Sequence, residues 1–465
     1  MFLNLENKDY KKAAMINDLN ETITYGELID FTAEFRQWIN NRCVIFILCE
    51  NSIGAVSGFI SSIENKIVPL MLSHDIDEIQ LQGFIRTYEP EYLWVPTRLA
   101  SKFDYKIVAE KYNYSLLKTE YNEYVMYNKL SMLLATSGST GSPKLVRHSY
   151  ENLNAAASNV AESFQLKQDE VAMISLPINF TQGLSTVTSN IYVGGTILLT
   201  TSTLVQKEFW KLMKEKKATS FTGVPYSYDI LHRLRFTRMN LPELRIINEG
   251  GGRLTDNMFN ELAEYALNNN KKFIASYGST ETTSRMAYLK PELAIKKCGS
   301  IGNAIANGKI KIFDGDTVVK RRNTLGEIVY YGANVTLGYA VCKEDLQKSD
   351  ERYGIYRTGD IGYFDEDNCI FVVGRQKRFL KVYGYRIGLD ETERMLKLEF
   401  GSEIACVGTD KKMIIYTTIK NKNDEMISFI EQKTNINRAG FEVRVINEIP
   451  KNITGKVQYN LLDNN

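Results

Sequence analysis

One stretch of the sequence, residues 136–144, has the composition of a loop that binds a polyphosphate. It reads Thr-Ser-Gly-Ser-Thr-Gly-Ser-Pro-Lys. Glycines let the backbone approach a ligand closely, and successive N–H groups and hydroxyls can donate to phosphate oxygens. A Ser/Gly-rich surface turn is the alternative interpretation, but the apolar run at 132–135 predicts a buried strand before the loop. The candidate phosphate ligands are Thr136, Ser137, Gly138, Ser139, Thr140, Gly141 and Lys144.

The loop differs from a Walker P-loop, which has Gly directly before its lysine and Ser or Thr directly after it. Here Pro143 and Leu145 occupy those two positions. The sequence therefore predicts a different nucleotide-binding fold.

Four further stretches combine polar residues with glycine. Residues 248–254 contain three consecutive glycines after the apolar run 244–247, which permits a flat ligand to approach the backbone. Residues 277–281 read Tyr-Gly-Ser-Thr-Glu, residues 356–360 read Tyr-Arg-Thr-Gly-Asp, and residues 450–456 end in Gly-Lys. Taken singly, each stretch could be a turn or a solvated charged loop.

Together the stretches resemble the motifs of the AMP-forming adenylate-forming enzymes, and they occur in that family's order. The family includes acyl-CoA synthetases, adenylation domains of peptide synthetases, D-alanine carrier-protein ligases and beetle luciferases. Residues 136–144 resemble its TSGSTGxPK loop, and residues 277–281, 356–360 and 450–456 resemble its YGxTE, YRTGD and PxxxxGK motifs. These motifs span roughly two thirds of the chain, and residues 282–286 look closest to acyl-CoA-synthetase-like members.

The resemblance implies roles for the first motifs. Tyr277 packs on adenine, Thr280 donates its hydroxyl to the α-phosphate, and Glu281 holds Mg²⁺. The residue types suit these tasks, because an aromatic face suits a purine and a carboxylate is a hard oxygen ligand for Mg²⁺. The other implied nucleotide-binding positions are Gly251, Gly252, Arg253 and Gly278.

The last third of the chain supplies a second group of implied site residues. Asp360 is placed on the ribose hydroxyls, since a carboxylate can accept from two vicinal hydroxyls, and Arg375 contacts ribose or phosphate. Lys377 occupies the hinge position, Lys381 the position just before the thiol-tunnel loop, and Gly384 the tunnel itself. Without the resemblance, this basic cluster would be interpreted as a solvated charged turn.

Lys456 is the implied catalytic lysine. Negative charge builds on the transferring phosphoryl group and on the leaving pyrophosphate, and a positioned ammonium stabilises that charge. A lysine in a frayed C-terminal tail is the alternative interpretation.

The segment 176–185 resembles the family's acid-pocket segment, which implies that Phe180, Thr181 and Gly183 line the pocket. Thr181 falls where amino-acid-activating relatives commonly have an aspartate for the substrate ammonium. Because a hydroxyl cannot neutralise an ammonium and a buried unpaired ammonium is costly, we expect an acid without an α-amino group. Phe180 could gate the pocket or belong to the core, and another acid such as Glu249 could serve an ammonium.

Helical and strand patterns alternate along the chain. The spacing of apolar residues predicts helices over 25–40, 53–63, 150–164 and 210–217, and strands over 44–48, 67–70, 93–95, 132–135 and 244–247. Such alternation predicts an α/β fold with doubly wound sheets that bind ligands at the carboxyl ends of their strands. With the resemblance, we expect an N-terminal AMP-binding domain over 1–374, a hinge at 375–377 and a small mobile C-terminal α+β lid domain over 378–465.

Composition narrows the functional classes. The formal net charge of +2 on 465 residues gives no reason to invoke nucleic acid or a charged membrane surface. The three histidines are far apart in the sequence, which argues against a histidine-based zinc site. The six cysteines contain no CxxC pair, which predicts free thiols. The uncharged stretch 171–206 contains Pro, Asn and Gly, so it predicts buried core and no membrane span. We see no signal peptide and expect a cytoplasmic protein.

These expectations combine into an ATP-dependent acid-thiol ligase. A small carboxylic acid and ATP, with Mg²⁺, give acyl-AMP and pyrophosphate. The thiol of coenzyme A or of an acyl carrier protein's phosphopantetheine then takes the acyl group. Two alternatives remain open: an amino-acid-activating enzyme that loads a separate carrier protein, and a non-catalytic nucleotide-binding relative.

Overall fold

The computed structural model describes residues 2–135, 144–375, 378–382, 385–409, 411–434, 436–452 and 455–462. The chain divides into two units, the first made of Met1–Lys309 with Tyr330–Tyr356 and the second of Ile310–Val329 with Arg357–Asn465. A large α/β part built on extensive sheets and a smaller C-terminal part are both present, so the predicted fold class is confirmed. The boundaries expected at 374 and 377 stay predictions, and the hinge residue Lys377 lies outside the described residues.

The first unit contains an eight-stranded sheet. Its central strands are parallel to one another, and antiparallel strands complete both edges. In spatial order the strands are β20 (Gly338–Ala340), β9 (Leu145–Ser149), β8 (Leu130–Ala135), β4 (Val68–Ser73), β3 (Val44–Cys49), β5 (Tyr92–Pro96), β7 (Tyr114–Lys118) and β6 (Lys106–Lys111).

A nine-stranded sheet forms the rest of the first unit. The strands from β14 to β1 run parallel, and β15, β16 and β2 are antiparallel to their neighbours. In spatial order they are β16 (Asn303–Ala304), β15 (Ser284–Leu289), β14 (Lys272–Ser279), β13 (Ile246–Gly250), β12 (Ser220–Gly223), β10 (Val171–Met173), β11 (Thr196–Leu199), β1 (Ala13–Asn17) and β2 (Thr22–Thr24).

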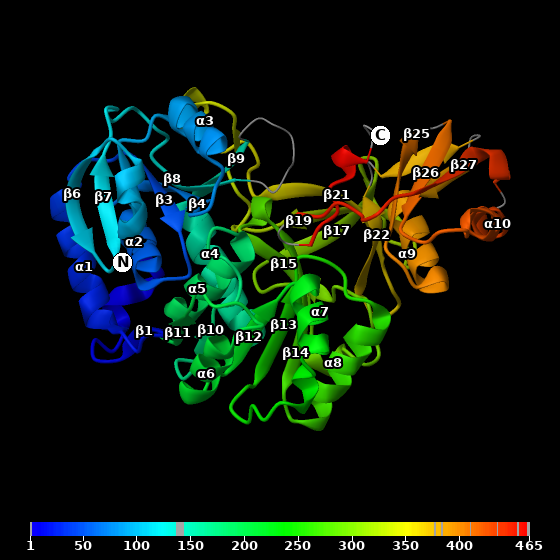
Figure 1. The fold of residues 1–465 in the computed structure, drawn as a ribbon, viewed down its shortest axis with the longest axis horizontal. Coiled ribbons are helices and arrows are strands. Elements are labelled where there is room, and N and C mark those ends of the chain that lie inside the picture. The colour runs from blue at the N-terminus through cyan, green and yellow to red at the C-terminus, as the bar shows by residue number, and fades with distance from the viewer. Residues whose placement is uncertain are drawn as a thin grey trace. The chain divides into compact units, whose positions relative to one another are not determined.

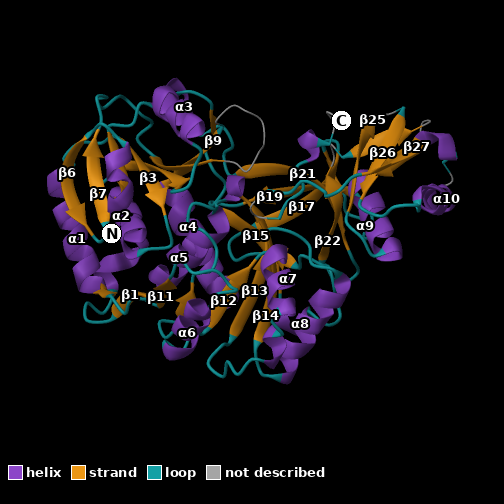
Figure 2. Ribbon diagram, in the orientation of Figure 1, coloured by secondary structure: helices purple, strands orange, loops and turns teal. Residues whose placement is uncertain are grey.

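Helices cover both faces of each sheet, as the purple and orange elements of Figure 2 show. One core joins residues of both sheets to α1 (Tyr25–Trp38), α2 (Ile53–Glu64), α4 (Tyr150–Phe164) and α5 (Thr181–Val193). On the outer faces, α3 (Glu78–Tyr88) covers the eight-stranded sheet, and α6 (Lys207–Glu215), α7 (Pro225–Arg233) and α8 (Asp256–Asn268) cover the other. Figure 1 shows α7 and α8 beside β13 and β14.

This two-sided burial explains the dense apolar runs of the sequence. In β3, residues 44, 46 and 48 pack in the core beside α3, whereas residues 45, 47 and 49 pack in the core shared by the two sheets. A strand buried on both faces is apolar throughout, which is typical of parallel sheets. The uncharged stretch 171–206 has the same cause, because it forms β10, α5 and β11 inside this unit.

Local signals fixed several helix starts. Ser149 caps α4, where its hydroxyl accepts from Asn152 N and the Asn152 side chain accepts from Ser149 N, so the expected cap is confirmed. Thr24 and Glu27 form the same reciprocal arrangement at α1. The helix expected over 210–217 is α6, which begins earlier, at Lys207. The strand expected over 244–247 is β13, which begins at Ile246 and continues to Gly250.

The second unit holds smaller sheets. Most of a five-stranded sheet belongs to it, in the order β18 (Thr317–Val318), β17 (Lys309–Asp314), β19 (Gly326–Tyr331), β21 (Ile355–Phe364) and β22 (Ile370–Arg375). A separate hydrophobic core of this unit lies between two helices and three strands, and a hairpin contributes to it. The helices are α9 (Leu389–Phe400) and α10 (Asn423–Thr434), the strands are β25 (Ile404–Thr409), β26 (Lys412–Thr417) and β27 (Phe441–Val445), and the hairpin is β23 (Phe379–Val382) with β24 (Tyr385–Gly388).

Gly58 on α2 shows how closely this helix approaches the eight-stranded sheet. A Cβ at Gly58 would lie 2.3 Å from Nε1 and 2.4 Å from Cδ1 of Trp94, a fully buried side chain of β5. Gly83 on α3 is a helical glycine with open space, because nothing lies within 4 Å of the Cβ it would gain.

We predict that Gly58→Ala destabilises the first unit by about 2 kcal/mol, because the clash with Trp94 outweighs the gain in helix propensity. The matched change Gly83→Ala should stabilise it by about 0.5–1 kcal/mol. Urea unfolding followed by tryptophan fluorescence tests both, because all three tryptophans of the chain lie in this unit. Equal effects of the two variants would contradict the prediction.

His148 on β9 is a fully buried polar residue of the same unit. Thr283 Oγ1 donates to Asn334 O at 2.8 Å, so its oxygen is left to accept from His148 Nδ1, 3.2 Å away. His148 Nε2 is buried without a hydrogen-bond partner among the described residues. Burial first, and the positive charge of Arg352 second, lower the pKa of His148 from 6.5 to about 3.

A histidine with a depressed folded pKa costs stability when the pH falls below its unfolded pKa, because only the unfolded chain takes up the proton. We therefore predict that the stability of the first unit falls between pH 6.5 and pH 4 with a contribution from His148 of up to about 1.4 kcal/mol per pH unit. His148→Asn should remove this part of the slope in urea unfolding, whereas His232→Asn, at an exposed histidine, serves as the control. An unchanged slope in His148→Asn would refute the assignment.

Candidate active site

The carboxylate of Glu281 lies directly after the end of β14. β14 ends at Ser279, and the short 3-10 helix η4 (Thr280–Thr282) carries Thr280 and Glu281 directly after it. The hydroxyl of Tyr339 donates to Glu281 Oε1 at 2.7 Å. One oxygen of the carboxylate is therefore fixed by the protein, and the side chain stays half-exposed.

Tyr339 also meets the lysine of the expected phosphate loop. Lys144 Nζ lies 3.4 Å from the centroid of the Tyr339 ring, a cation–π contact. The contact follows from the sheet, because β20 pairs with β9 and places Tyr339 opposite Val146. Burial, and then the charge of Glu281, raise the pKa of Tyr339 to about 12, so its hydroxyl keeps the proton that it donates.

The remaining members of the expected phosphate loop are Thr136, Ser137, Gly138, Ser139, Thr140 and Gly141, and they lie outside the described residues. β8 and β9 on either side of the loop are paired, with Ala135 opposite Leu145. The strand expected before the loop is therefore confirmed, whereas the phosphate contacts stay a prediction.

Two glycines of the expected site are required by the backbone itself. A Cβ at Gly278 would lie 1.5 Å from the carbonyl oxygen of Ser284, at a bulge between β14 and β15. Gly251 has φ +83°, which favours glycine, and its added Cβ would lie 2.9 Å from Gln182 Oε1. Gly251 and Gly252 are exposed directly after β13, which is the neighbour of β14 in the sheet.

The other expected adenine-site residues lie at the same strand ends. Tyr277 is half-buried in β14, and Arg253 is exposed after β13, where its Nη2 donates to Asp256 Oδ1 at 3.1 Å. The register sets Gly250 opposite Ser276, so the residues that follow both strands are neighbours. Their contact with adenine stays a prediction.

The expected acid-pocket segment forms the start of α5. Phe180 is the N-cap residue, Thr181 begins the helix, and both are half-buried. A Cβ at Gly183 would lie 2.3 Å from the carbonyl oxygen of Pro177, so packing alone requires a glycine there. The side chain of Gln182 reaches Gly251, which brings the start of α5 to the end of β13.

A buried arginine that the sequence reasoning missed links α5 to the strands. Arg285 donates to Ser185 Oγ at 2.6 Å and to Asn248 Oδ1 at 2.8 Å, and burial lowers its pKa to about 10. These bonds join α5, β13 and β15, and so hold the start of α5 against the ends of the sheet. No local pattern predicts this link, because Ser185 and Asn248 are 100 and 37 residues away from Arg285 in the sequence.

Glu249 is fully buried in β13, and its Oε1 has no hydrogen-bond partner among the described residues. Burial raises its pKa well above the ordinary value of a glutamate, so the carboxyl group favours its neutral form. A positive charge bound beside it would shift this equilibrium toward the carboxylate.

In the second unit, Asp360 and Arg375 meet across two strands. They are register partners of β21 and β22, and Arg375 Nε donates to Asp360 Oδ1 at 3.2 Å. Arg375 N also donates to Asp390 Oδ2 at 3.0 Å, which ties the end of β22 to α9. The sequence places these two residues in separate motifs, and the antiparallel pairing brings them together.

Lys456 lies in a tight loop of the second unit. Its backbone N donates to Asn452 Oδ1 at 2.9 Å, and Asn452 N donates to Lys456 O at 2.9 Å. The Lys456 side chain is exposed. Lys381 lies in β23, where it pairs with Arg386, and the expected tunnel residue Gly384 lies outside the described residues.

The residues around Glu281 fit a magnesium ion that is shared with phosphates. Among the described residues, no group of three His, Cys, Asp or Glu side chains could hold a metal ion by itself. Mg²⁺ is usually held by one or two carboxylates, with phosphate oxygens and waters as its other ligands. A single oriented carboxylate beside a lysine therefore meets the requirement.

In the described part of the chain, no helix is long and apolar enough to cross a membrane.

Comparison with known proteins identifies the family. The family described as AMP-binding enzyme matches residues 4–340. The 2-succinylbenzoate–CoA ligase of Bacillus pumilus is 28% identical over 340 residues, which cover 71% of this chain and 68% of the relative. The oxalate–CoA ligase of Arabidopsis thaliana is 26% identical over 348 residues, 70% of this chain and 66% of the relative.

The fold agrees with that of a solved relative. The O-succinylbenzoate coenzyme A synthetase (MenE) of Bacillus subtilis, in complex with ATP and magnesium ion, superimposes with a TM-score of 0.80 at 23% identity and covers 99% of this chain and 98% of its own. The family that the motifs predicted is therefore confirmed: the chain belongs to the AMP-binding enzymes.

Proposed function

We propose that this chain is an ATP-dependent acid-thiol ligase. It activates a small carboxylic acid as acyl-AMP, releases pyrophosphate, and transfers the acyl group to a phosphopantetheine thiol. The observation that carries the proposal is the arrangement at Tyr339, whose hydroxyl holds Glu281 while its ring contacts Lys144. The carboxylate that we assign to the metal and the ammonium that we assign to phosphate thus contact the same side chain, with Glu281 directly after β14 and Lys144 directly before β9.

The relatives support the same chemistry. Those reported above are named as CoA ligases, and another solved MenE structure contains an acyl-adenylate intermediate. An AMP-forming ligase with ATP, Mg²⁺ and coenzyme A as its cofactors agrees with these names. A carrier protein would present the same phosphopantetheine arm, and we retain it as the alternative acceptor.

The first half-reaction depends on charge. When the carboxylate of the acid attacks the α-phosphorus, negative charge grows on the phosphoryl oxygens and on the leaving pyrophosphate. Mg²⁺, held by Glu281, supplies electrostatic stabilisation of this charge when bound. Thr280 donates to the α-phosphate, Lys144 and the loop at 136–143 bind the other phosphates, and Tyr277 with Gly251, Gly252, Arg253 and Gly278 borders the adenine.

The C-terminal residues supply the remaining contacts. Asp360 accepts from the ribose hydroxyls while Arg375, its partner, holds that carboxylate in place. Lys456 stabilises the charge of the adenylation transition state. A rotation at 375–377, with Lys377 as the hinge, then exchanges Lys456 for the side of the lid that carries Lys381 and Gly384, which serves the thiol. A single site that performs two unlike steps gains from such a motion.

The acid is one without an α-amino group. Thr181 is neutral, and the buried carboxyl of Glu249 favours its neutral form. A substrate ammonium beside Thr181 would find no counter-charge on that residue, and a buried unpaired charge is costly. An ammonium beside Glu249 would favour the ionised carboxylate, so Thr181 alone carries this inference. Phe180, Thr181 and Gly183 at the start of α5 form the acid pocket. We expect the reaction to take place in the cytoplasm.

We predict that Lys456→Ala lowers acid-dependent exchange of pyrophosphate into ATP by about 10²-fold or more, because one stabilising charge is lost from the transition state. Exchange is measured across fatty, aryl, hydroxy and amino acids. Lys451→Ala is the matched control, since Lys451 lies in the same loop and its ammonium pairs with Glu403 at 2.9 Å.

Exchange with one class of acid names the substrate class. Transfer of the acyl group from preformed acyl-AMP to coenzyme A should stay intact in Lys456→Ala. Exchange that depends on an amino acid would overturn the argument from Thr181, and equal losses in Lys456→Ala and Lys451→Ala would remove the assigned role of Lys456.

A further inference from the structure

Arg352 is a cation beside Glu281 to which the proposed function gives no task. It follows β20 in the first unit, and its side chain is half-buried. Its guanidinium lies 4.5 Å from the ring centroid of Tyr339 and 5.1 Å from that of Tyr356. Nη1 donates to Thr336 Oγ1 at 2.6 Å and to the carbonyl oxygen of Glu281 at 3.3 Å. These partners, all among the described residues, are neutral groups.

Arg352 shares the Tyr339 ring with Lys144. The ammonium lies 3.4 Å from the ring centroid and the guanidinium 4.5 Å from it. Both cations therefore contact one side chain, and an anion bound by both would gain from each of the two charges. The planar guanidinium presents two parallel N–H donors that match the oxygens of a phosphate, which a lysine cannot do.

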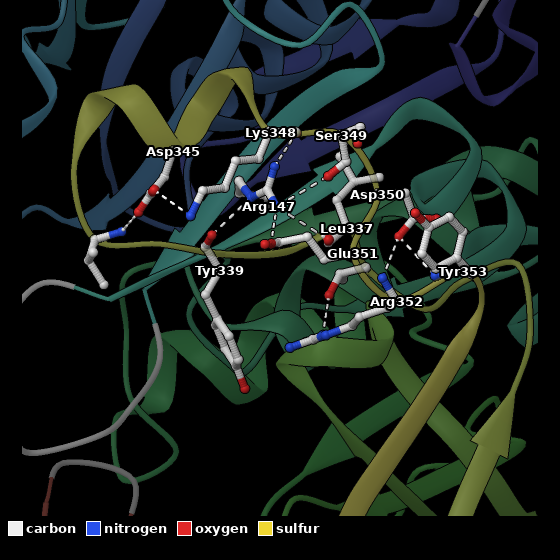
Figure 3. Close-up of polar contacts among 12 residues, drawn as sticks. Arg147, Leu337, Tyr339, Asp345, Lys348, Ser349, Asp350, Glu351, Arg352 and Tyr353 are labelled. Atoms are coloured by element: carbon white, nitrogen blue, oxygen red, sulfur yellow. Dashed lines mark hydrogen bonds and ion pairs between the residues drawn. The ribbon is translucent and has the colours of Figure 1, made fainter.

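A second arginine fixes the segment that carries Arg352. The side chain of Arg147 is fully buried, and its Nη2 pairs with Glu351 Oε2 at 2.5 Å. Figure 3 shows Glu351 directed at Arg147 and Arg352 extending away from it. Asp350 Oδ1 accepts from Arg352 N at 2.8 Å, so the backbone on this side of Arg352 is held as well. Arg147 also donates to the carbonyl oxygens of Leu337, Tyr339, Lys348 and Ser349.

This clamp relates Arg352 to the site. Arg147 Nε donates to the carbonyl oxygen of Tyr339 at 3.0 Å, and the same guanidinium holds Glu351. The strand that positions the Tyr339 ring and the segment that positions Arg352 are therefore fixed by one buried side chain. A fixed cation needs no reorganisation when charge develops in a reaction, which is the condition for electrostatic stabilisation.

We propose that Arg352 binds the β- and γ-phosphates of ATP, and the pyrophosphate that leaves, together with Lys144. The inference rests on the proposed function and adds a residue to its phosphate site. In the step concerned, a bond forms between a carboxylate oxygen of the acid and the α-phosphorus. The bond from that phosphorus to the bridging oxygen breaks, and its electron pair leaves on pyrophosphate, where Arg352 meets the added charge.

Calorimetric titration of the full chain with Mg²⁺·ATP, inorganic pyrophosphate and AMP tests the proposal. AMP lacks both phosphates that Arg352 would bind. Arg352→Gln should lower the affinity for ATP and for pyrophosphate by about 10-fold or more and leave the affinity for AMP unchanged. Arg352→Lys keeps the charge without the paired donors, so its affinity for ATP should fall between those of the wild type and Arg352→Gln. Arg36→Gln, at an exposed arginine in the last turn of α1, is the control.

A purely structural role would give a different pattern. If Arg352 only held Thr336 and Glu281 in place, its loss would lower the affinity for AMP by the same factor as the affinity for ATP. That result overturns the proposal. Unchanged affinity for ATP and pyrophosphate in Arg352→Gln overturns it too. If Arg352→Gln fails to fold, the ratio of ATP to AMP affinity in Arg352→Lys decides in the same way. A wild-type chain that binds no ATP would instead refute the proposed function, and the inference with it.

Discussion

The buried guanidinium of Arg147 joins the parts of the chain that carry Tyr339 and Arg352. It donates to the carbonyl oxygens of Leu337, directly before β20, and of Tyr339, within β20, and it pairs with Glu351, so one residue of β9 holds two later segments. Removing an arginine from water is costly, and only a full set of acceptors offsets that cost. Because all of these acceptors except the Glu351 carboxylate are backbone carbonyls, the interaction fixes the path of the chain and, with it, the direction of Tyr339.

Tyr339 converts that path into an electrostatic arrangement. Its hydroxyl orients Glu281, and its ring contacts Lys144 and Arg352. An oriented carboxylate beside two cations suits a metal–polyphosphate complex, in which the metal takes the carboxylate and the phosphates take the cations. Pre-arranged charges of this kind are usually the largest contribution to the catalysis of such reactions.

The sheets supply the rigid base for these residues. Strands buried on both faces carry side chains that cannot bind ligands, so the chemistry collects where the strands end and the chain turns. β13 and β14 each lead into such a turn, with Gly251 and Gly252 after the first and Glu281 after the second, and β8 ends directly before the residues expected to bind phosphate. In the second unit strand pairing also positions candidate site residues, because the register of β21 on β22 places Arg375 opposite Asp360.

The sequence by itself determined the family, the fold class and the residues that lie within single motifs. Ser149 capped its helix as expected, and Glu281 followed the expected strand, because capping and strand patterns act over a few residues. Tyr339, Arg352 and Arg285 escaped sequence reasoning. Tyr339 is 58 residues from Glu281, and only the register of β20 on β9 brings it near Lys144.

Gly183 also shows a difference between what a motif predicts and what tertiary contacts decide. Its place in the acid pocket stays a prediction, and the tertiary structure adds a packing reason for the glycine, because the carbonyl oxygen of Pro177 excludes any side chain there. Local sequence records the short-range demands of caps, turns and strands. Which distant side chains meet is decided by how the sheets pair and pack, since that depends on long-range contacts that no single motif contains.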